Sequence, residues 1–219
     1  MATNETASTS ATGAENGLNS EKARRIVEAM RQCIGKLGPV NSTFDVVAKE
    51  AGVSRGLLHY YFGTKERLMI EVLRVDAQER IDAIHALAPQ IKTAEDIMNL
   101  FLTHLQEWLA VSPDSYALIY EMIGEARRND EIGTANRAMW HRVENEVAAL
   151  LQRVQDEGAI QMRGSAKACA LAILAMGHGL AMVILAEPDA DHSEMTDRII
   201  EAANYVLGQE SPSARGATA

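Results

Sequence analysis

Apolar residues recur every three to four positions through almost all of residues 20–208, and this periodicity limits the chain to helical folds. No stretch of useful length alternates between apolar and polar residues, as a half-buried strand would. We therefore predict an all-α protein. The expected helices cover residues 20–37, 43–51, 54–62, 64 onward, 93–110, 114–126, 131–157, 165–186 and 192–207.

The helices near the N-terminus are short and sharply punctuated. Gly38 and Pro39 are stop signals for the first helix, and Ser42 with Asp45 has the form of a capping box that opens the second. A tight turn at Gly52 joins two helices of only two to three turns, which is the sequence form of a helix-turn-helix. We expect a helix-turn-helix domain over residues 20–75, a second helical domain over residues 76–208, and disordered tails over residues 1–19 and 209–219.

The overall charge argues against a nucleic-acid partner, but the distribution of charge reverses that argument. The 219 residues carry a formal net charge of -9. Residues 20–75 hold ten Lys and Arg against six Asp and Glu, a net charge of +4, which leaves -13 on the remainder. A local positive field is what contact with phosphate requires.

The sequence offers no basis for catalysis. It has no nucleophile–base pair, no metal-ligand spacing and no phosphate-binding loop, so we expect no enzyme activity, no catalytic or metal-ligating residues and no cofactor. The two cysteines, Cys33 and Cys169, are too few for a disulfide framework. No secretory signal is visible, and we expect a reducing, cytoplasmic location.

The helix expected over residues 54–62 divides its aromatic side chains between two faces. At about 100° per residue, Leu58, Tyr61 and Phe62 fall on one face, which should be buried. The opposite face should carry Arg55, Gly56, His59 and Tyr60. A glycine there costs about 1 kcal/mol of helix stability relative to alanine, which makes sense where another surface must approach the backbone.

Double-stranded DNA is the partner that explains this face. A recognition helix lies in the major groove, where Arg55 can pair with guanine and where His59 and Tyr60 reach phosphates or bases. Thr43 and Lys65 lie in the first turns of the flanking helices, where free N–H groups and the helix dipole attract phosphate.

The segment STFDVVAKEAGVSRGLLHYYFGTKERL, residues 42–68, resembles the DNA-binding domain of the tetracycline-repressor (TetR) family. The resemblance covers roughly residues 21–75. It departs from the family pattern at Ile34, at Pro39 and in the order of His59 and Tyr60. By similarity, the residues at DNA-contacting positions are Thr43, Ser54, Arg55, Leu57, His59, Tyr60 and Lys65, and we add Gly56 for close approach.

The resemblance also implies how the rest of the chain is organised. TetR-like proteins are homodimers that bind operator DNA, and the last two helices pair across the dimer axis. The second domain binds a small-molecule inducer. We therefore expect a ligand-responsive regulator, most simply a repressor that binds a palindromic operator as a dimer. Bulky side chains of the middle helices are the candidate ligand-binding residues: Trp108, Tyr116, Tyr120, Met122, Trp140, Met176 and His178.

Plain core packing is the competing interpretation of each of those seven residues. An architectural DNA-binding protein that responds to no ligand is the alternative function. Residues 168–186 form an apolar run at the threshold length for a membrane helix, so a tail-anchored membrane protein is a further alternative. The run is rich in Ala and Gly, which favours a helix buried by its own domain and by a dimer partner, with no membrane contact.

Overall fold

The computed structural model describes residues 21–111 and 113–209, and within these ranges the side chains of residue 104 and of residues 106–117 are outside the description. The tail expected over residues 1–19 also lies outside it, as do residues 210–219 of the tail expected over residues 209–219. The described residues form helices and no strands, so the all-α prediction is confirmed. The helices are α2 (Glu21–Asn41), α3 (Phe44–Ala51), α4 (Arg55–Phe62), α5 (Lys65–Leu87), α6 (Ala94–Val111), α7 (Pro113–Ala126), α8 (Asp130–Asp156), α9 (Ala166–Ala186) and α10 (Ser193–Val206), with a 3-10 turn at Ala88–Gln90.

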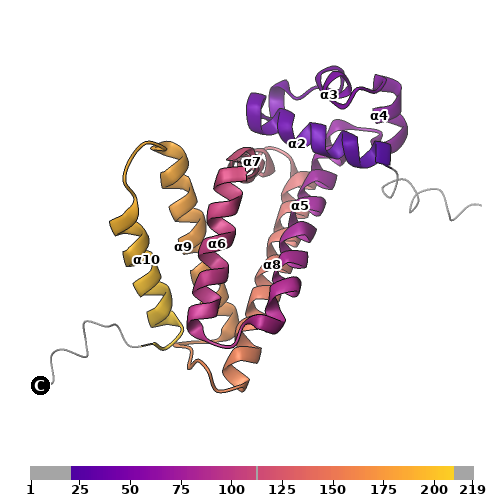
Figure 1. Ribbon diagram of the computed structural model, residues 1–219. Helices are drawn as coiled ribbons and strands as arrows, with labels where there is room; N and C mark the ends of the chain where they lie inside the picture. Colours follow the sequence, from indigo (N-terminus) through magenta and orange to yellow (C-terminus); the bar gives the residue numbers. More distant parts are fainter. Residues whose placement is uncertain (1–20, 112, 210–219) are drawn as a thin grey trace, which may run out of the picture.

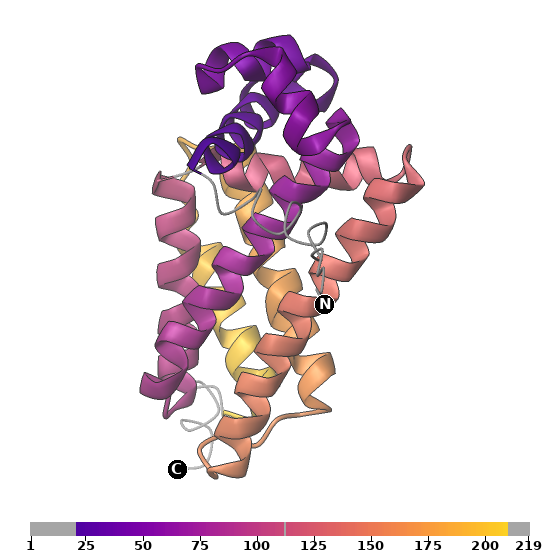
Figure 2. The same ribbon diagram turned by 90° about the vertical axis from the view of Figure 1, so that its right-hand side faces the viewer.

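The helices α2, α3 and α4, with the start of α5, form a unit at one end of the molecule (Figures 1 and 2). Ile26, Met30, Leu58 and Leu68 are fully buried in its core. The turn between α3 and α4 depends on Gly52, whose φ of 64° is in the left-handed region that favours glycine.

The boundary between α2 and α3 differs in detail from the sequence prediction. The backbone leaves helical geometry at Gly38 as expected, but a further turn continues to Asn41. The predicted capping role of Ser42 is wrong, because its hydroxyl donates to the carbonyl of Gly38 at 2.8 Å. Thr43 is the N-cap of α3 instead, and its hydroxyl accepts a hydrogen bond from Val46 N.

A single helix connects the N-terminal unit to the rest of the molecule. α5 runs without interruption through residue 75, where the sequence suggested a domain boundary. α7 packs against α2, and Leu118, Met122 and Ile132 share one hydrophobic core with α2 and α5. The N-terminal unit and the second domain are therefore joined by packed side chains as well as by α5.

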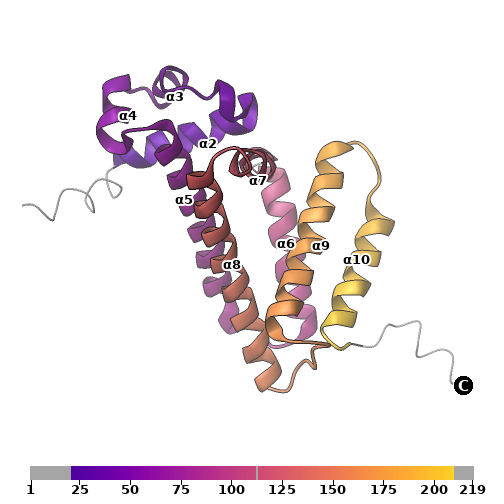
Figure 3. The same ribbon diagram turned by 180° about the vertical axis from the view of Figure 1, so that it is seen from behind.

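The second domain consists mainly of α5, α6, α8, α9 and α10, with α10 at its edge next to α9 (Figure 3). α9 is long and apolar enough to cross a membrane by length and composition, and a third of that apolar window is buried. Its exposed positions share one face, which includes Leu171 (44% exposed) and Met182 (54% exposed). Within one chain α9 is thus covered on one side only, whereas the sequence suggested complete burial once a partner is present.

The helix α9 uses one of its glycines for internal packing. A Cβ atom at Gly177 would lie 2.5 Å from the ring of Phe101, a distance that side chains do not tolerate. Gly177 therefore allows α6 to approach α9 inside the domain. Its buried position agrees with the expectation that small residues of this helix let other backbones approach.

Candidate nucleic-acid interface and ligand cavity

The outward face of α4 carries the side chains that the helical wheel placed there. Arg55, Gly56, His59 and Tyr60 are exposed, and the ring of Tyr60 is 80% exposed. Leu58 and Phe62 are buried on the opposite face, and Tyr61 is partly buried. Ser54 is the exposed N-cap of α4, and the half-buried Leu57 packs against the core.

Polar contacts orient two of these side chains. Arg55 Nη1 donates to Asp45 of α3 at 3.0 Å, and both side chains are more than half exposed. The ring nitrogen Nδ1 of His59 lies 3.0 Å from the carbonyl oxygen of Gly63, so this nitrogen is the donor. An exposed ion pair contributes about 0–1 kcal/mol, whereas a bidentate contact to a base contributes about 1–3 kcal/mol. Arg55 can therefore exchange Asp45 for guanine at a net gain.

Lys65 has a structural role that the sequence did not indicate. Its ammonium group donates to the carbonyl of Pro39 and, at 3.3 Å, to the carbonyl of Val40. These carbonyls belong to the last turn of α2, so the side chain ties the start of α5 to the end of α2.

We expect Lys65→Ala to lower the free energy of unfolding by about 1–2 kcal/mol, because it removes hydrogen bonds from a charged donor to partly buried carbonyls. Urea denaturation measures this difference. Lys49→Ala, which removes an exposed lysine of α3, is the matched control and should leave stability within about 0.5 kcal/mol. Equal stability of the two variants would contradict the structural role of Lys65.

The second domain contains a cavity of about 120 Å³ between α5, α6, α8 and α9. Its wall is apolar apart from Arg80 and His178. The apolar side chains of the wall include Ile84, Leu100, Phe101, Val147, Leu150 and Leu174. A smaller cavity of about 30 Å³ lies next to it, and Arg80 and Val143 line both.

The hydrogen bonds of Arg80 and His178 and the protonation state of His178 follow from their surroundings. Arg80 donates to Asp76 Oδ2 at 2.7 Å; the side chain of Asp76 is buried and that of Arg80 is largely buried. His178 Nδ1 lies 2.7 Å from the carbonyl oxygen of Leu174, to which it donates. Burial lowers the pKa of His178, and the charge of Arg80 lowers it further; the hydrogen bond to Leu174 and the carboxylate of Asp76 act in the opposite direction. The imidazole is therefore neutral at neutral pH.

The seven candidate ligand-binding residues do not form one site. His178 lines the main cavity, and Trp140 lines the smaller one with its ring edge-on to His178 at 4.9 Å. Tyr120 lines neither cavity, and its hydroxyl donates to the carbonyl of His178 at 2.7 Å. The side chains of Trp108 and Tyr116 lie outside the described part of the structure.

Met122 and Met176 are also absent from both cavity walls. Met122 is fully buried in the core that α7 shares with α2. Met176 packs against the core of the second domain, one position away from the cavity-lining Gly177. Both are core residues, which is the interpretation that competed with ligand binding in the sequence.

Asp76 and Arg80 are the cavity residues that sequence reasoning missed. The inward-facing stripe of α5 runs through the buried Leu68, Val72 and Asp76 and continues to the partly buried Arg80, at intervals of four residues. Two charged residues that continue an apolar stripe are the signal that could have identified them, because buried charges are rare unless paired.

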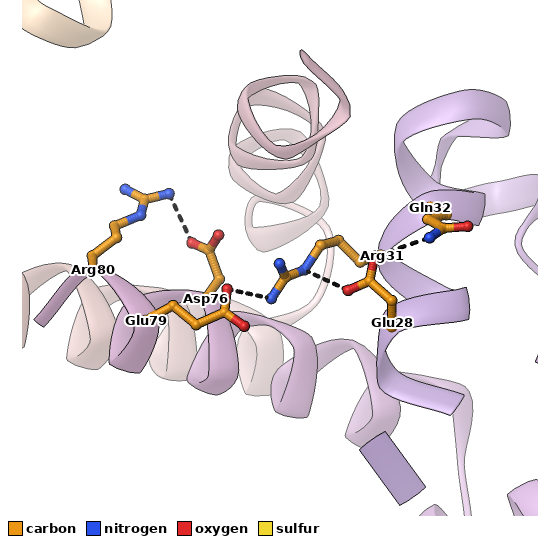
Figure 4. Close-up of polar contacts among 6 residues, drawn as sticks. All are labelled: Glu28, Arg31, Gln32, Asp76, Glu79 and Arg80. Atoms are coloured by element: carbon orange, nitrogen blue, oxygen red, sulfur yellow. Dashed lines mark hydrogen bonds and ion pairs between the residues drawn. The ribbon is translucent and has the colours of Figure 1, made fainter. Parts of the chain in front are cut away.

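Polar contacts connect α2 to α5 close to the cavity (Figure 4). Arg31 Nη2 of α2 donates to Glu79 Oε2 of α5 at 2.9 Å, and Arg31 also pairs with Glu28. Glu79 directly precedes Arg80 of the cavity wall. Glu79, which contacts the N-terminal unit, is thus adjacent in sequence to Arg80, the charged residue that lines the main cavity.

Comparison with known proteins identifies the family. Residues 26–72 match the family model described as "Bacterial regulatory proteins, tetR family", and residues 96–204 match the one described as "BetI-type transcriptional repressor, C-terminal". The chain belongs to the TetR family. These matches confirm the predicted class of function, a ligand-responsive transcriptional repressor.

Three relatives illustrate the similarity. The HTH-type transcriptional regulator BetI of Agrobacterium fabrum is 29% identical over 153 residues, which are 68% of this chain and 74% of the relative. The structure of Salmonella enterica GusR has a TM-score of 0.73 at 18% identity and covers 87% of this chain and 99% of its own. A regulator from Saccharomonospora viridis in complex with choline has a TM-score of 0.65 at 21% identity, with coverages of 84% and 94%. The two structures show that the fold is shared.

Membership of the TetR family places the chain among soluble, DNA-binding regulators that bind operator DNA and small molecules and act as dimers. The family is one of transcriptional regulators rather than of enzymes. Among the described residues, no group of three His, Cys, Asp or Glu side chains is arranged to hold a metal ion.

Proposed function

We propose that this protein is a cytoplasmic repressor that binds a palindromic operator as a homodimer and leaves it when a small molecule occupies the second domain. The observation that carries the proposal is the exposed face of α4. This face carries the guanidinium of Arg55, the polar rings of His59 and Tyr60, and Gly56, where no neighbouring side chain blocks the approach of another surface. It belongs to residues 20–75, which have a net charge of +4.

The DNA contacts follow from that face. Arg55 reads a base, His59 and Tyr60 contact phosphates or base edges, and Gly56 lets the groove approach the backbone. Ser54, Leu57 and Thr43 lie at the N-terminal ends of α4 and α3 or close to them. Lys65 contributes to DNA binding by holding the start of α5 against the end of α2. Its ammonium group contacts phosphate only if it leaves the carbonyl oxygens of Pro39 and Val40.

The dimer forms through α9 and α10. The exposed face of α9 presents Leu171 and Met182, and α10 presents Tyr205, which is also exposed. Apolar side chains at these positions favour burial against a second copy. A four-helix arrangement of this kind also accounts for the apolar composition of α9 without a membrane.

The ligand controls the distance between the two recognition helices. It binds in the main cavity, whose wall includes Ile84 and Arg80 of α5. α5 is also fixed to α8 by Gln78–Arg142 at 2.8 Å and by His85–Glu146 at 2.7 Å. A ligand that prefers a different separation of α5 and α8 therefore shifts α5, and with it the N-terminal unit.

We expect Arg55→Ala to lose discrimination at one base pair of each half-site, at a cost of roughly 1–3 kcal/mol there. Competition between operators that differ at single positions measures this effect. His59→Ala is the comparison, because loss of a ring contact to phosphate weakens binding to all operators equally, whereas loss of a contact to a base edge relaxes a position other than the one that Arg55 reads. Uniform weakening across all operators by Arg55→Ala would contradict the role of Arg55 as base reader.

The decisive experiment is selection of bound sequences from a random duplex library, followed by a footprint and light scattering. We expect a palindromic site covered by a dimer. A non-palindromic footprint, or binding that no small molecule reverses, would favour the architectural, ligand-independent alternative.

A further inference from the structure

The charges in the cavity walls cancel. The side chains of Arg80 and Asp76 are 14% and 7% exposed and form an ion pair at 2.7 Å. The third titratable group, His178, is neutral because its burial disfavours the charged imidazolium. The cavity therefore has no uncompensated charge to offer to a ligand.

Among the described residues, the buried oxygen Asp76 Oδ1 beside the cavity has no hydrogen-bond partner. Asp76 lines the smaller cavity, whose 30 Å³ has room for about one hydroxyl or water. A buried carboxylate oxygen without a partner carries a desolvation cost, which a ligand donor placed there would remove.

We propose that the effector is an uncharged small molecule with a compact apolar body and one hydrogen-bond donor, such as a hydroxyl group. The apolar body fills the main cavity and the donor binds Asp76 Oδ1. The volume of 120 Å³ sets the size, because a cavity of about 150 Å³ holds benzene. This inference rests on the proposed function and specifies the ligand class of its cavity.

A charged ligand would have to separate the ion pair. A carboxylate that pairs with Arg80 leaves the buried Asp76 without its counter-charge, and a cation at Asp76 leaves Arg80 in the same state. Breaking a buried pair in this way is strongly unfavourable. An uncharged ligand leaves the pair intact and adds apolar contacts.

The test compares four molecules of nearly the same shape on the full-length protein. They are choline, its uncharged isostere neohexyl alcohol, the anion tert-butylacetate and the hydrocarbon neohexane. We expect neohexyl alcohol to bind at least about tenfold more tightly than choline or tert-butylacetate. It should also bind about tenfold more tightly than neohexane, which lacks the donor. Calorimetry and the shift of the unfolding temperature measure binding without reference to DNA.

Two outcomes would overturn the inference. One is equal or tighter binding of choline or tert-butylacetate, and the other is no binding of any of the four molecules. If choline binds more tightly and releases the operator, the proposed function stands and only the ligand class is wrong. Binding of the free protein to a selected operator tests the proposed function separately.

Variants of the ion pair sharpen the test. Asp76→Asn leaves the charge of Arg80 uncompensated and should shift the preference to tert-butylacetate by tenfold or more. Arg80→Met leaves the charge of Asp76 and should shift it to choline to a similar degree. If neither variant folds, the comparison of the four ligands on the unaltered protein still decides whether the effector is uncharged.

A second pair of variants locates the ligand. Ile84→Phe fills the cavity from α5 and should abolish binding of neohexyl alcohol. Leu87→Phe adds a ring three residues later on the same helix, outside the cavity wall, and should leave binding unchanged. Loss of binding in both variants, or in neither, would place the ligand elsewhere.

Discussion

The Gly56→Leu variant is expected to fold like the unaltered protein and to lose operator binding. A Cβ atom at Gly56 meets only Ser54 Oγ, at an ordinary contact distance of 3.9 Å, so the fold has room for the larger side chain. Leucine favours a helix more than glycine does, by up to about 1 kcal/mol. On the DNA side the added bulk blocks the groove, and each protomer loses base contacts of about 1–3 kcal/mol. We therefore expect affinity to fall roughly a hundredfold or more.

Gly124→Leu is the matched control for this variant. Gly124 is in the interior of α7, and the nearest atom to a Cβ there is the flexible end of Arg128 at 4.0 Å. It should keep both stability and operator affinity. Thermal unfolding and gel shift separate the possibilities: a Gly56→Leu protein that unfolds would show that this glycine packs against the core.

The Leu171→Glu, Met182→Glu double variant is expected to be monomeric. The two residues lie eleven positions apart on the exposed face of α9, about 16 Å along the helix. Four carboxylates across a two-fold interface would be buried without counter-charges. Loss of the dimer removes the gain from simultaneous binding of two half-sites, so operator affinity should fall by about 10²–10⁴.

The control places the same two charges on other exposed apolar side chains, Ile123 of α7 and Leu87 of α5. Ile123→Glu, Leu87→Glu should remain dimeric and keep its operator affinity. Light scattering gives the mass of each protein. A dimeric Leu171→Glu, Met182→Glu protein would show that the subunits pair through another surface.

The sequence predicts well those features that depend on neighbouring residues. The left-handed turn at Gly52, the capping of α5 by Thr64 and the division of α4 into two faces all follow from local spacing. The helix ends agree to within one or two residues for the same reason, except near Gly38, where a further turn follows the break.

Contacts between distant residues could not be predicted in this way. The ammonium of Lys65 binds carbonyls 25 and 26 residues earlier, and Arg31 finds Glu79 across 48 residues. Such pairs depend on how the helices cross, which the residue types alone do not specify. The same holds for the cavity, where bulky residues such as Met122 and Met176 fill the core and the space lies elsewhere.

The unbroken course of α5 makes it a lever. Its 23 residues form a rod about 35 Å long, with the cavity at one end and the recognition helix attached at the other. A tilt of about 4° at the cavity would displace the far end by roughly 2–3 Å. In a symmetric pair both ends move, so the separation changes by about 5 Å, which exceeds one base-pair step of about 3.4 Å. A ligand of a few heavy atoms is therefore large enough to move the two recognition helices out of register with their half-sites.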